Sequence, residues 1–364
     1  MKQNNTLPML NKSLFLNVLI AFLLFVVSCS NPASDQNKTA VIENESKELA
    51  SWLEKNGNYI ASAEVPAVIS AGELYSLLGN NILLIDLRDA EQYAAGYIDG
   101  AINLGTDKVI DFFMQRIDPA SFEKIIFVDN RGQLSAYVTS VMRMIGYNNV
   151  FSLRFGMSSW NAGFAAAGWD KVIGNELTDK LDYESHAKNP KGNVWPKLST
   201  GASRASSIAL LRAQQLLSKD APAFLMDYKD LMKNPSAYYI INYWPEEQYL
   251  KAGHLPGAIQ YTPKVSLQSN EDLLTLPVDK PIVVYCYTGQ HAANVTAWLR
   301  MLGYDAHSLI YGSNAFMHQV LTGPAFAPSH YWGDAHKHNF PLSNSAAPAA
   351  ATNTTENKAA KGGC

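Results

Sequence analysis

The sequence contains little cysteine and no excess of basic charge. Its 364 residues include three cysteines, Cys29, Cys286 and Cys364, which are too few and too far apart for a disulfide framework or a zinc site of the Cys-x-x-Cys type. There are 29 Lys and Arg against 32 Asp and Glu, and the resulting net charge of −3 provides no basic field for the phosphates of nucleic acid. We therefore expect no nucleic acid partner, and each cysteine is interpreted on its own.

The chain also has no apolar run long enough to span a bilayer. The run at 14–27 falls short of the ~20 apolar residues that a transmembrane helix needs. Lys2 and Lys12 precede this run, and no acidic residue occurs before Asp35. A basic start followed by a short apolar run is typical of an export signal, which we place at 1–28.

The signal ends in Val26-Val27-Ser28-Cys29, which resembles the lipobox of bacterial lipoproteins. The resemblance implies cleavage before Cys29, acylation of its thiol and of the new amino terminus, and a polar tether and lead-in over 29–63. Several acyl chains hold a protein firmly at a membrane, at ~0.8 kcal/mol per buried CH₂. We therefore expect a lipid-anchored protein of the bacterial cell envelope, on its periplasmic or extracellular face. An export signal without lipidation is the alternative.

The length and the 47% content of apolar residues predict about two globular domains. The sequence repeats at a spacing of 157 residues, so that Arg-Met-Ile-Gly-Tyr at 143–147 corresponds to Arg-Met-Leu-Gly-Tyr at 300–304, and Gly-Ala-Ile occurs at both 100–102 and 257–259. Two copies at this spacing indicate a duplicated domain, because a solenoid has shorter and more numerous units.

We place domain 1 at 64–172 and domain 2 at 201–327. The stretch between them, 173–200, is rich in Lys, Asn and Pro and has little apolar periodicity, which is typical of a linker. Residues 328–364 are expected to form a flexible tail.

Each copy alternates short apolar runs, bounded by turn residues, with helical patterns. The expected strands lie at 82–85, 124–128, 239–241 and 281–285, and the helices that follow lie at 135–145 and 292–302. The sequence therefore predicts an α/β fold of two tandem domains, each with a central, mainly parallel sheet flanked by helices. Ligands of such sheets bind beyond the carboxyl ends of the strands, so the loops after Val128 and Tyr285 are the candidate sites.

In domain 2, Cys286 lies between an expected strand and an expected helix. The loop that follows it consists of Tyr287, Thr288, Gly289, Gln290 and His291. Gly289 permits a positive φ, which turns loop N–H groups inward. Converging amides and the positive end of a helix dipole favour a nucleophilic thiolate. We therefore expect Cys286 to be a nucleophile of lowered pKa in an anion-binding loop, with an inert core cysteine as the alternative.

The second copy contains GHLPGAI at 253–259, the Cys286 loop, and a Leu-Gly-Tyr that closes the helix at 302–304. The first copy contains Asp-Leu-Arg at 86–88 and GMSSW at 156–160. In these motifs, both copies resemble rhodanese domains. The resemblance implies a sulfurtransferase that moves sulfane sulfur through a persulfide on Cys286. It also implies a small-molecule or protein sulfur donor, a thiol or cyanide-like acceptor, and no cofactor.

At the position equivalent to Cys286, the first copy has Asp129. A carboxylate cannot carry a persulfide, so domain 1 is expected to be catalytically inactive. The Asp129 carboxylate is expected to occupy its amide loop as a built-in anion, paired with the nearby Arg131. A plain helix cap at Asp129 is compatible with this role.

The second copy also departs from the family pattern. The family often has Asp-x-Arg at the end of the earlier strand, where domain 2 has Asn242 and Trp244. The Cys286 loop contains no Lys or Arg to hold a dianion, and His291 is only partly protonated near pH 7. Thiosulfate is therefore expected to be a doubtful donor. His291 is either this partial charge or a helix-start residue without a chemical role.

Two other functions are consistent with parts of the pattern. A cysteine phosphatase or arsenate-type enzyme needs Arg six positions after the nucleophile, where this chain has Ala292. A non-catalytic rhodanese-like binding module, whose loop recognises an anionic group on a partner, is the main alternative to an enzyme. The residues Asp129, Asn242 and Trp244 favour it.

Two further features lie near the end of the chain. His330, His336 and His338, with Asp334, contain metal-ligating groups, but their polar, Pro-flanked segment is more typical of a solvated loop, and we expect no metal site. Cys364 ends a polar stretch with an r.m.s. reach of ~26 Å, which suits either an acceptor thiol for Cys286 or a terminal cysteine without a role.

Overall fold

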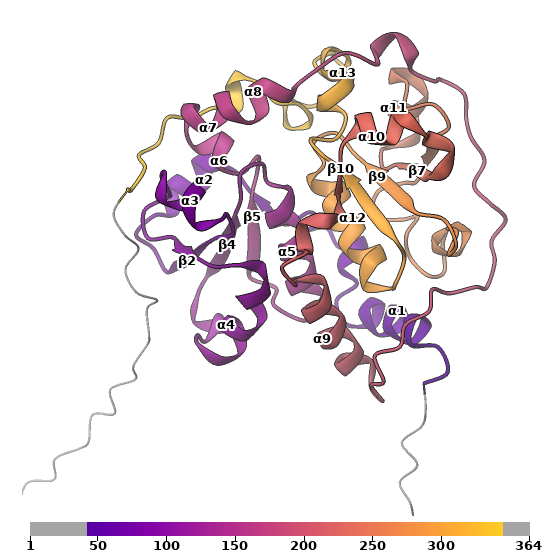
Figure 1. Ribbon diagram of the computed structural model, residues 1–364, viewed down its shortest axis with the longest axis horizontal. Coiled ribbons are helices and arrows are strands. Elements are labelled where there is room, and N and C mark those ends of the chain that lie inside the picture. Colours follow the sequence, from indigo (N-terminus) through magenta and orange to yellow (C-terminus); the bar gives the residue numbers. More distant parts are fainter. Residues whose placement is uncertain (1–41, 345–364) are drawn as a thin grey trace, which may run out of the picture. The chain divides into compact units, whose positions relative to one another are not determined.

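The computed structural model of the protein describes residues 42–344 (Figure 1). The expected export signal, the lipidation site Cys29 and the terminal Cys364 lie outside these residues. Within 42–344, no helix combines the length and the apolar character needed to cross a bilayer.

Domain 1 is built on a five-stranded sheet in which every neighbouring pair of strands is parallel. The strands, in spatial order, are β1 (Val68–Ile69), β5 (Val150–Leu153), β4 (Lys124–Val128), β2 (Ile82–Asp86) and β3 (Ile102–Asn103). The central strand β4 is fully buried from Ile125 to Val128. Burial on both faces is why this strand is a continuous apolar run without alternation.

Domain 2 repeats this topology. Its strands, in spatial order, are β6 (Leu225–Met226), β10 (Ala306–Leu309), β9 (Ile282–Tyr285), β7 (Tyr239–Asn242) and β8 (Ile259–Gln260), and all neighbours are again parallel. The predicted class of two tandem α/β domains with central parallel sheets is therefore confirmed.

Helices flank both sheets. In and before domain 1 they are α1 (Glu45–Lys55), α2 (Ala71–Leu77), α3 (Ala90–Ala94), α4 (Val109–Gln115), α5 (Gln133–Met144), α6 (Met157–Trp160), α7 (Ala162–Ala167) and α8 (Trp169–Val172). In domain 2 they are α9 (Ala205–Leu216), α10 (Tyr228–Lys233), α11 (Glu246–Ala252), α12 (Gln290–Met301) and α13 (Asn314–Leu321). The helices α5 and α12 begin two residues earlier than expected, because the glycines before them act as left-handed caps.

The two domains meet through the equivalent helices α5 and α12, which pack together (Figure 1). Two buried glutamines form reciprocal hydrogen bonds across this interface. Gln133 Nε2 donates to the carbonyl of Leu309 at 3.0 Å, and Gln290 Nε2 donates to the carbonyl of Gly132 at 3.1 Å. Gln133, the first residue of α5, thus holds the end of β10, and Gln290, the first residue of α12, holds the loop before α5.

The glycine before each helix has two reasons to be glycine. Gly132 has φ of 89° and Gly289 has φ of 79°, in the left-handed region that favours glycine. A Cβ atom on Gly289 would also lie 2.2 Å from Gln133 Nε2, and one on Gly132 would lie 2.5 Å from Gln290 Nε2. A Cβ atom at either position would displace the glutamine of the other domain and would also meet a backbone atom of its own domain, Leu309 O or Phe155 N.

Two expected boundaries differ from the structure. Residues 328–344, expected to belong to a flexible tail, pack on domain 1, where Ser343 forms a β-bridge with Tyr97 and Trp160 Nε1 donates to the carbonyl of Pro341 at 2.9 Å. The lead-in at 29–63 contains the helix α1, and Ser46 Oγ in it donates to the carbonyl of Leu302 in domain 2 at 2.7 Å. Ring stacking and hydrogen bonds attach the segment 328–344, and such contacts have no sequence periodicity. The helix α1 is attached mainly by its buried apolar residues Leu49, Ala50 and Leu53, which pack in the core beside α9.

Candidate active site

The strand β9 ends at Tyr285 and places Cys286 at the carboxyl edge of the domain 2 sheet, directly before α12. The loop of Tyr287, Thr288 and Gly289 turns the chain so that the first turn of the helix faces the thiol. Cys286 Sγ accepts the backbone N–H of Ala292 at 3.3 Å. A sulfur held against a helix N-terminus is positioned to carry negative charge.

The net effect on the Cys286 thiol differs from the expectation. Burial raises the pKa of Cys286, whose exposed fraction is 1%, while the backbone amides of Ala292, Thr288, Gly289 and His291 act in the opposite direction. The amide loop therefore exists, but the expected lowering of the thiol pKa is wrong, because desolvation outweighs the four amides. Before anything binds, Cys286 is a protonated thiol near neutral pH.

Cys286 lines a cavity of about 230 Å³ between the two domains. Its walls come from three parts of the chain. The lining residues are Pro66, Val68 and Arg154 from domain 1, Cys286, Tyr287, Thr288, Gln290 and His291 from domain 2, and Ser329 and His330 from the segment after domain 2. The thiol is thus buried but faces a space of small-molecule size.

Arg154 is the functional candidate that sequence reasoning missed. It follows β5 of domain 1, and its guanidinium forms no ion pair or hydrogen bond with any part of the chain that the structure describes. Burial lowers its pKa, and it still affects the pKa of His330 on the opposite wall. The Cys286 loop contains no Lys or Arg, and Arg154 of domain 1 therefore supplies the positive charge. Because the contact depends on how the domains pack, no local sequence signal marks it.

His291 does not supply positive charge. Burial of its imidazole, with Lys264 nearby, lowers the pKa of His291 to about 3, so the ring is neutral at pH 7. It packs edge-on against Tyr243, with ring centroids 4.9 Å apart. Of the two roles left open for His291, the neutral ring therefore favours a helix-start residue over a partly protonated imidazole in the anion site.

Aromatic rings form the wall opposite domain 1. Tyr287 lies between His330 and Trp244, with centroid distances of 3.8 and 4.9 Å and nearly parallel planes. The Tyr287 hydroxyl donates to Gln248 Oε1, which fixes the ring. Burial, with Arg154 as a like charge, lowers the pKa of His330. This wall is therefore rigid and uncharged.

The three histidines of the segment after domain 2, His330, His336 and His338, pack against other side chains. His336 packs at 4.7 Å against Phe155, and His338 stacks at 4.6 Å on Phe340 while its Nδ1 contacts the carbonyl of Ser159. Lys337 rather than a histidine pairs with Asp334. The expectation of a solvated loop at 330–338 is wrong, since these side chains cover domain 1 and the Cys286 cavity.

In domain 1, Asp129 occupies the position of the thiol. Its carboxylate accepts the backbone N–H groups of Gly132 at 2.8 Å and of Arg131 and Leu134 at 3.3 Å, and the hydroxyl of Ser135 at 2.7 Å. The side chain therefore fills the amide loop of its own domain, as a fixed anion would.

The expected ion pair between Arg131 and Asp129 is absent from the described residues. Arg131 contacts the carboxylate through its backbone N–H, and its guanidinium lies over the ring of Tyr311 in domain 2, 5.3 Å from the centroid. The aromatic face competes successfully for this cation because the carboxylate is already satisfied by four donors.

The two copies also differ at the preceding strand. In domain 1, Asp86 and Arg88 form a buried ion pair at 2.6 Å. In domain 2, Asn242 Nδ2 donates to the Tyr285 hydroxyl at 3.0 Å, and Trp244 lies in the core. The neutral Asn242 and Trp244 therefore belong to the apolar support of the Cys286 loop, where a charge pair would be costly to bury.

Comparison with known proteins gives a consistent picture. Residues 70–163 and 225–319 match the family model described as "Rhodanese-like domain", and the two segments make up just over half of the chain. The thiosulfate sulfurtransferase GlpE of Pseudomonas entomophila is 29% identical over 97 residues, covering 26% of this chain and 85% of that protein. GlpE of Pseudoalteromonas translucida is 28% identical over 99 residues, covering 27% and 90%.

Two solved structures also match this chain, both with low TM-scores. A thiosulfate sulfurtransferase from Pseudomonas aeruginosa is 18% identical with a TM-score of 0.26, and the match covers 80% of this chain and 49% of that one. A rhodanese-like domain protein from Staphylococcus aureus is 25% identical with a TM-score of 0.23, covering 26% and 90%. The family resemblance found in the sequence is thus confirmed by both matched segments. The chain belongs to the rhodanese-like family and contains two copies of its domain.

Proposed function

We propose that the protein is a sulfurtransferase in which Cys286 carries sulfane sulfur from an anionic donor to a thiol or cyanide-like acceptor. The observation that carries this proposal is the placement of Cys286 Sγ, which is held by the amide of Ala292 and lines a cavity that Arg154 also lines. The Arg154 guanidinium has no ion pair or hydrogen bond in the described part of the chain. A nucleophile, amide donors and a cation thus surround one space of small-molecule size.

The reaction requires two displacements at sulfur. The Cys286 thiol first loses its proton, and the thiolate attacks the outer sulfur of the donor. A new S–S bond forms, and the bond between the two donor atoms breaks with its electron pair leaving on the departing group, which is sulfite when the donor is thiosulfate. The acceptor nucleophile then attacks the outer sulfur of the persulfide and releases the Cys286 thiolate.

Because the pKa of Cys286 is raised, the loop amides and Arg154 are needed to stabilise the negative charge that forms during the reaction. The thiolate is costly in the empty, buried cavity. A persulfide anion extends one atom further into the cavity than the thiol does. Its outer sulfur is therefore closer to hydrogen-bond donors that the thiol uses only in part. The amides of Thr288, Gly289 and His291 and the guanidinium of Arg154 stabilise the charge that develops along this path.

Arg154 also bears on the identity of the donor. The absence of cations from the Cys286 loop argued against thiosulfate, but Arg154 restores one positive charge from domain 1. Relatives named thiosulfate sulfurtransferase match this chain at 29% and 28% identity. We therefore propose a donor that combines a sulfane sulfur with an anionic sulfonyl group, as thiosulfate and organic thiosulfonates do.

Steady-state kinetics test this function. With thiosulfate and cyanide as the two substrates, double displacement predicts parallel lines in double-reciprocal plots and no activity in the Cys286→Ser variant. The Asp129→Ala variant is the matched control at the equivalent position, and it should retain the turnover of the wild type when it is folded. Turnover that survives Cys286→Ser would exclude the mechanism.

A non-catalytic binding module is the second candidate. The observation that favours it is the buried, protonated thiol of Cys286, whose 1% exposure and raised pKa both slow attack on a donor. This alternative predicts that sulfonate ligands bind in the cavity while no donor leaves sulfur on Cys286. Sulfur on Cys286 after exposure to thiosulfate or a thiosulfonate would exclude it.

We also propose that the protein acts outside the cytoplasm, anchored to the bacterial cell envelope by lipid on Cys29. The support is the sequence Val-Val-Ser-Cys that ends the predicted export signal. Mass spectrometry of the mature protein should find an acylated Cys29 at the amino terminus, and Cys29→Ser should abolish the modification. An uncleaved or unacylated chain would contradict this proposal and leave the enzymatic one unaffected.

A further inference from the structure

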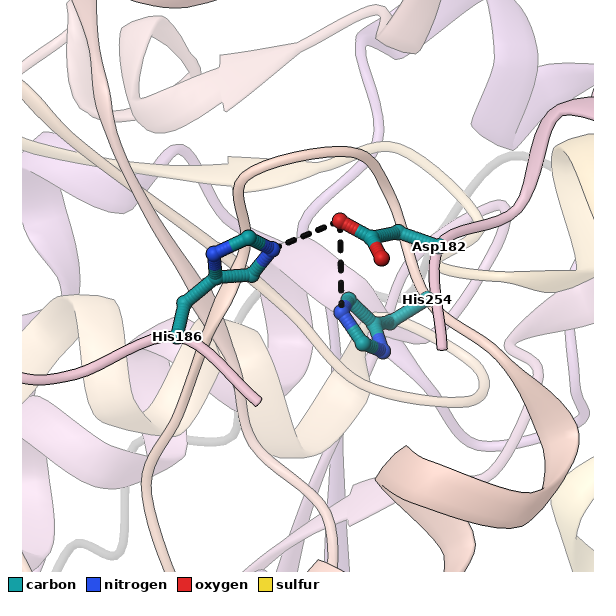
Figure 2. Close-up of side chains that lie close together, drawn as sticks. All are labelled: Asp182, His186 and His254. Atoms are coloured by element: carbon teal, nitrogen blue, oxygen red, sulfur yellow. Dashed lines mark hydrogen bonds and ion pairs between the residues drawn. The ribbon is translucent and has the colours of Figure 1, made fainter. Parts of the chain in front are cut away.

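A cluster of metal-ligating side chains lies away from the Cys286 cavity, where the linker between the domains meets domain 2. Its members are Asp182 and His186 of the linker and His254 after α11. One ligand atom of each lies within 4.8 Å of the other two. Figure 2 shows the contacts of both imidazoles converging on one carboxylate oxygen of Asp182.

The backbone brings these three residues together independently of their side chains. Asp182 and His254 form an antiparallel bridge, in which each backbone N–H donates to the carbonyl of the other at 2.8 and 2.9 Å. Gly253 next to it has φ of 80°, and a Cβ atom there would lie 2.9 Å from Cβ of Leu181. The linker is therefore fixed against domain 2 at this point, and the ligands start from a rigid frame.

His254 is held in the orientation of a metal ligand. Its ring is fully buried and stacks on Tyr249 at 3.6 Å, and its Nδ1 lies 3.0 Å from the carbonyl of Tyr249. Because a carbonyl oxygen can only accept a hydrogen bond, Nδ1 must carry the hydrogen. In the neutral ring, Nε2 then presents a lone pair. Metal-bound histidines have this arrangement, because the outer hydrogen bond fixes the tautomer.

The lone pair of His254 lacks a partner. Its buried Nε2 makes no hydrogen bond in the described part of the chain, and it points at Asp182 Oδ2, 4.0 Å away. Two further groups act on the pKa of this ring: the imidazole of His186 lowers it, and a weak backbone hydrogen bond with Glu184 raises it. A lone pair that faces a carboxylate oxygen across 4.0 Å is unfavourable unless a cation lies between them.

The distances bracket the ligand spacing of a small divalent cation, and the shorter one is a hydrogen bond between His186 and Asp182. Ligands at about 2.0–2.1 Å in tetrahedral geometry lie roughly 3.3 Å apart. Asp182 Oδ2 lies 2.6 Å from His186 Nε2 and 4.0 Å from His254 Nε2, so the observed separations lie on either side of that value. His186 and Asp182 are partly exposed at the linker surface, so their side chains can rotate to meet an ion while the buried His254 stays in place.

We propose that Asp182, His186 and His254 bind one Zn²⁺ ion, with a fourth position open to water. Two imidazoles and a carboxylate form a ligand set that zinc prefers, and three protein ligands leave a coordination position free. The ion joins the linker to domain 2. This site contains neither Cys286 nor a residue of its cavity, so it is independent of the proposed sulfur transfer.

Zinc binding to the full-length, tag-free chain tests the site. After metal is removed with a chelator, titration with ZnCl₂ should give one tight site per chain and raise the melting temperature. Asp182→Asn and His186→Gln should each abolish this binding and the thermal shift. Both residues are partly exposed, so these variants fold, whereas replacing the buried His254 would confound binding with stability.

Two controls make the outcome decisive. His307→Gln removes another histidine that pairs with an aspartate, Asp305 at 3.2 Å, and it should bind zinc like the wild type. Cys286→Ser should also bind normally, and Co²⁺ in the site should show d–d absorption without the charge-transfer band of a thiolate ligand. No stoichiometric binding, or binding that survives in both Asp182→Asn and His186→Gln, would overturn the proposal.

Discussion

Replacing Arg154 by Gln is expected to weaken the use of anionic sulfur donors more than the use of neutral donors. The guanidinium lines the Cys286 cavity without an ion-pair partner among the described residues, so a donor sulfonate would be its first. A hydrogen bond to a charged group contributes about 1.5–3 kcal/mol, which corresponds to a roughly 10- to 150-fold loss in kcat/KM. The loss appears mainly in KM if Arg154 binds the sulfonate equally in the ground and transition states.

The assay compares thiosulfate with a dialkyl trisulfide, a neutral sulfane donor, using cyanide as the acceptor for both. The control is Arg131→Gln, which removes the same charge from the equivalent cavity of domain 1, where no thiol is present. Equal losses with the two donors would mean that Arg154 acts on the persulfide or on the fold rather than by binding the donor anion. An unchanged kcat/KM with thiosulfate would refute the role assigned to the interdomain cation.

Three further predictions concern the loops. Asp129→Ala leaves three backbone N–H groups and the Ser135 hydroxyl without their acceptor, and urea unfolding should show a loss of about 1–3 kcal/mol, whereas an unchanged midpoint would argue against the built-in anion. Gly289→Ala should lower the free energy of unfolding by about 1–2 kcal/mol because of the positive φ alone, and by more because the new Cβ would contact Gln133. An unchanged free energy of unfolding in the same assay would contradict the interface geometry. The pKa of Cys286 is raised in the folded state, so the native protein keeps this proton to a higher pH than the unfolded chain does. Alkylation of Cys286 by iodoacetamide should therefore remain slow near the pH at which free thiols ionise, and the wild type should lose stability relative to Cys286→Ser as the pH rises through that range. Alkylation of Cys286 at pH 7 that is faster than that of a free thiol would refute the raised pKa.

The parts of the fold that sequence analysis predicted are those with local signals. The runs around β4 and β9 are continuous apolar strands between turns, and the glycines before α5 and α12 mark tight loops, so the sheets and the position of Cys286 followed from local patterns. The repeat at 157 residues predicted that the second domain would copy the first.

The parts that sequence analysis missed depend on packing between distant segments. Arg154 enters the Cys286 cavity only because α5 packs on α12, and His336 and His338 cover domain 1 through stacking that leaves no periodic pattern. The expected lowering of the Cys286 pKa is wrong for a related reason. The loop sequence reveals the amides that lower this pKa, but the burial that raises it depends on how Cys286 packs within domain 2, domain 1 and the segment after domain 2.

The central claim is that Cys286 accepts a sulfur atom within the interdomain cavity. Intact-mass spectrometry of the full-length chain, before and after incubation with thiosulfate or an aryl thiosulfonate, tests it most directly. We predict the gain of one sulfur atom, located on the peptide that contains Cys286, removed by cyanide and absent from Cys286→Ser. An unchanged mass with every anionic and neutral donor, in protein whose fold is intact, would contradict the claim.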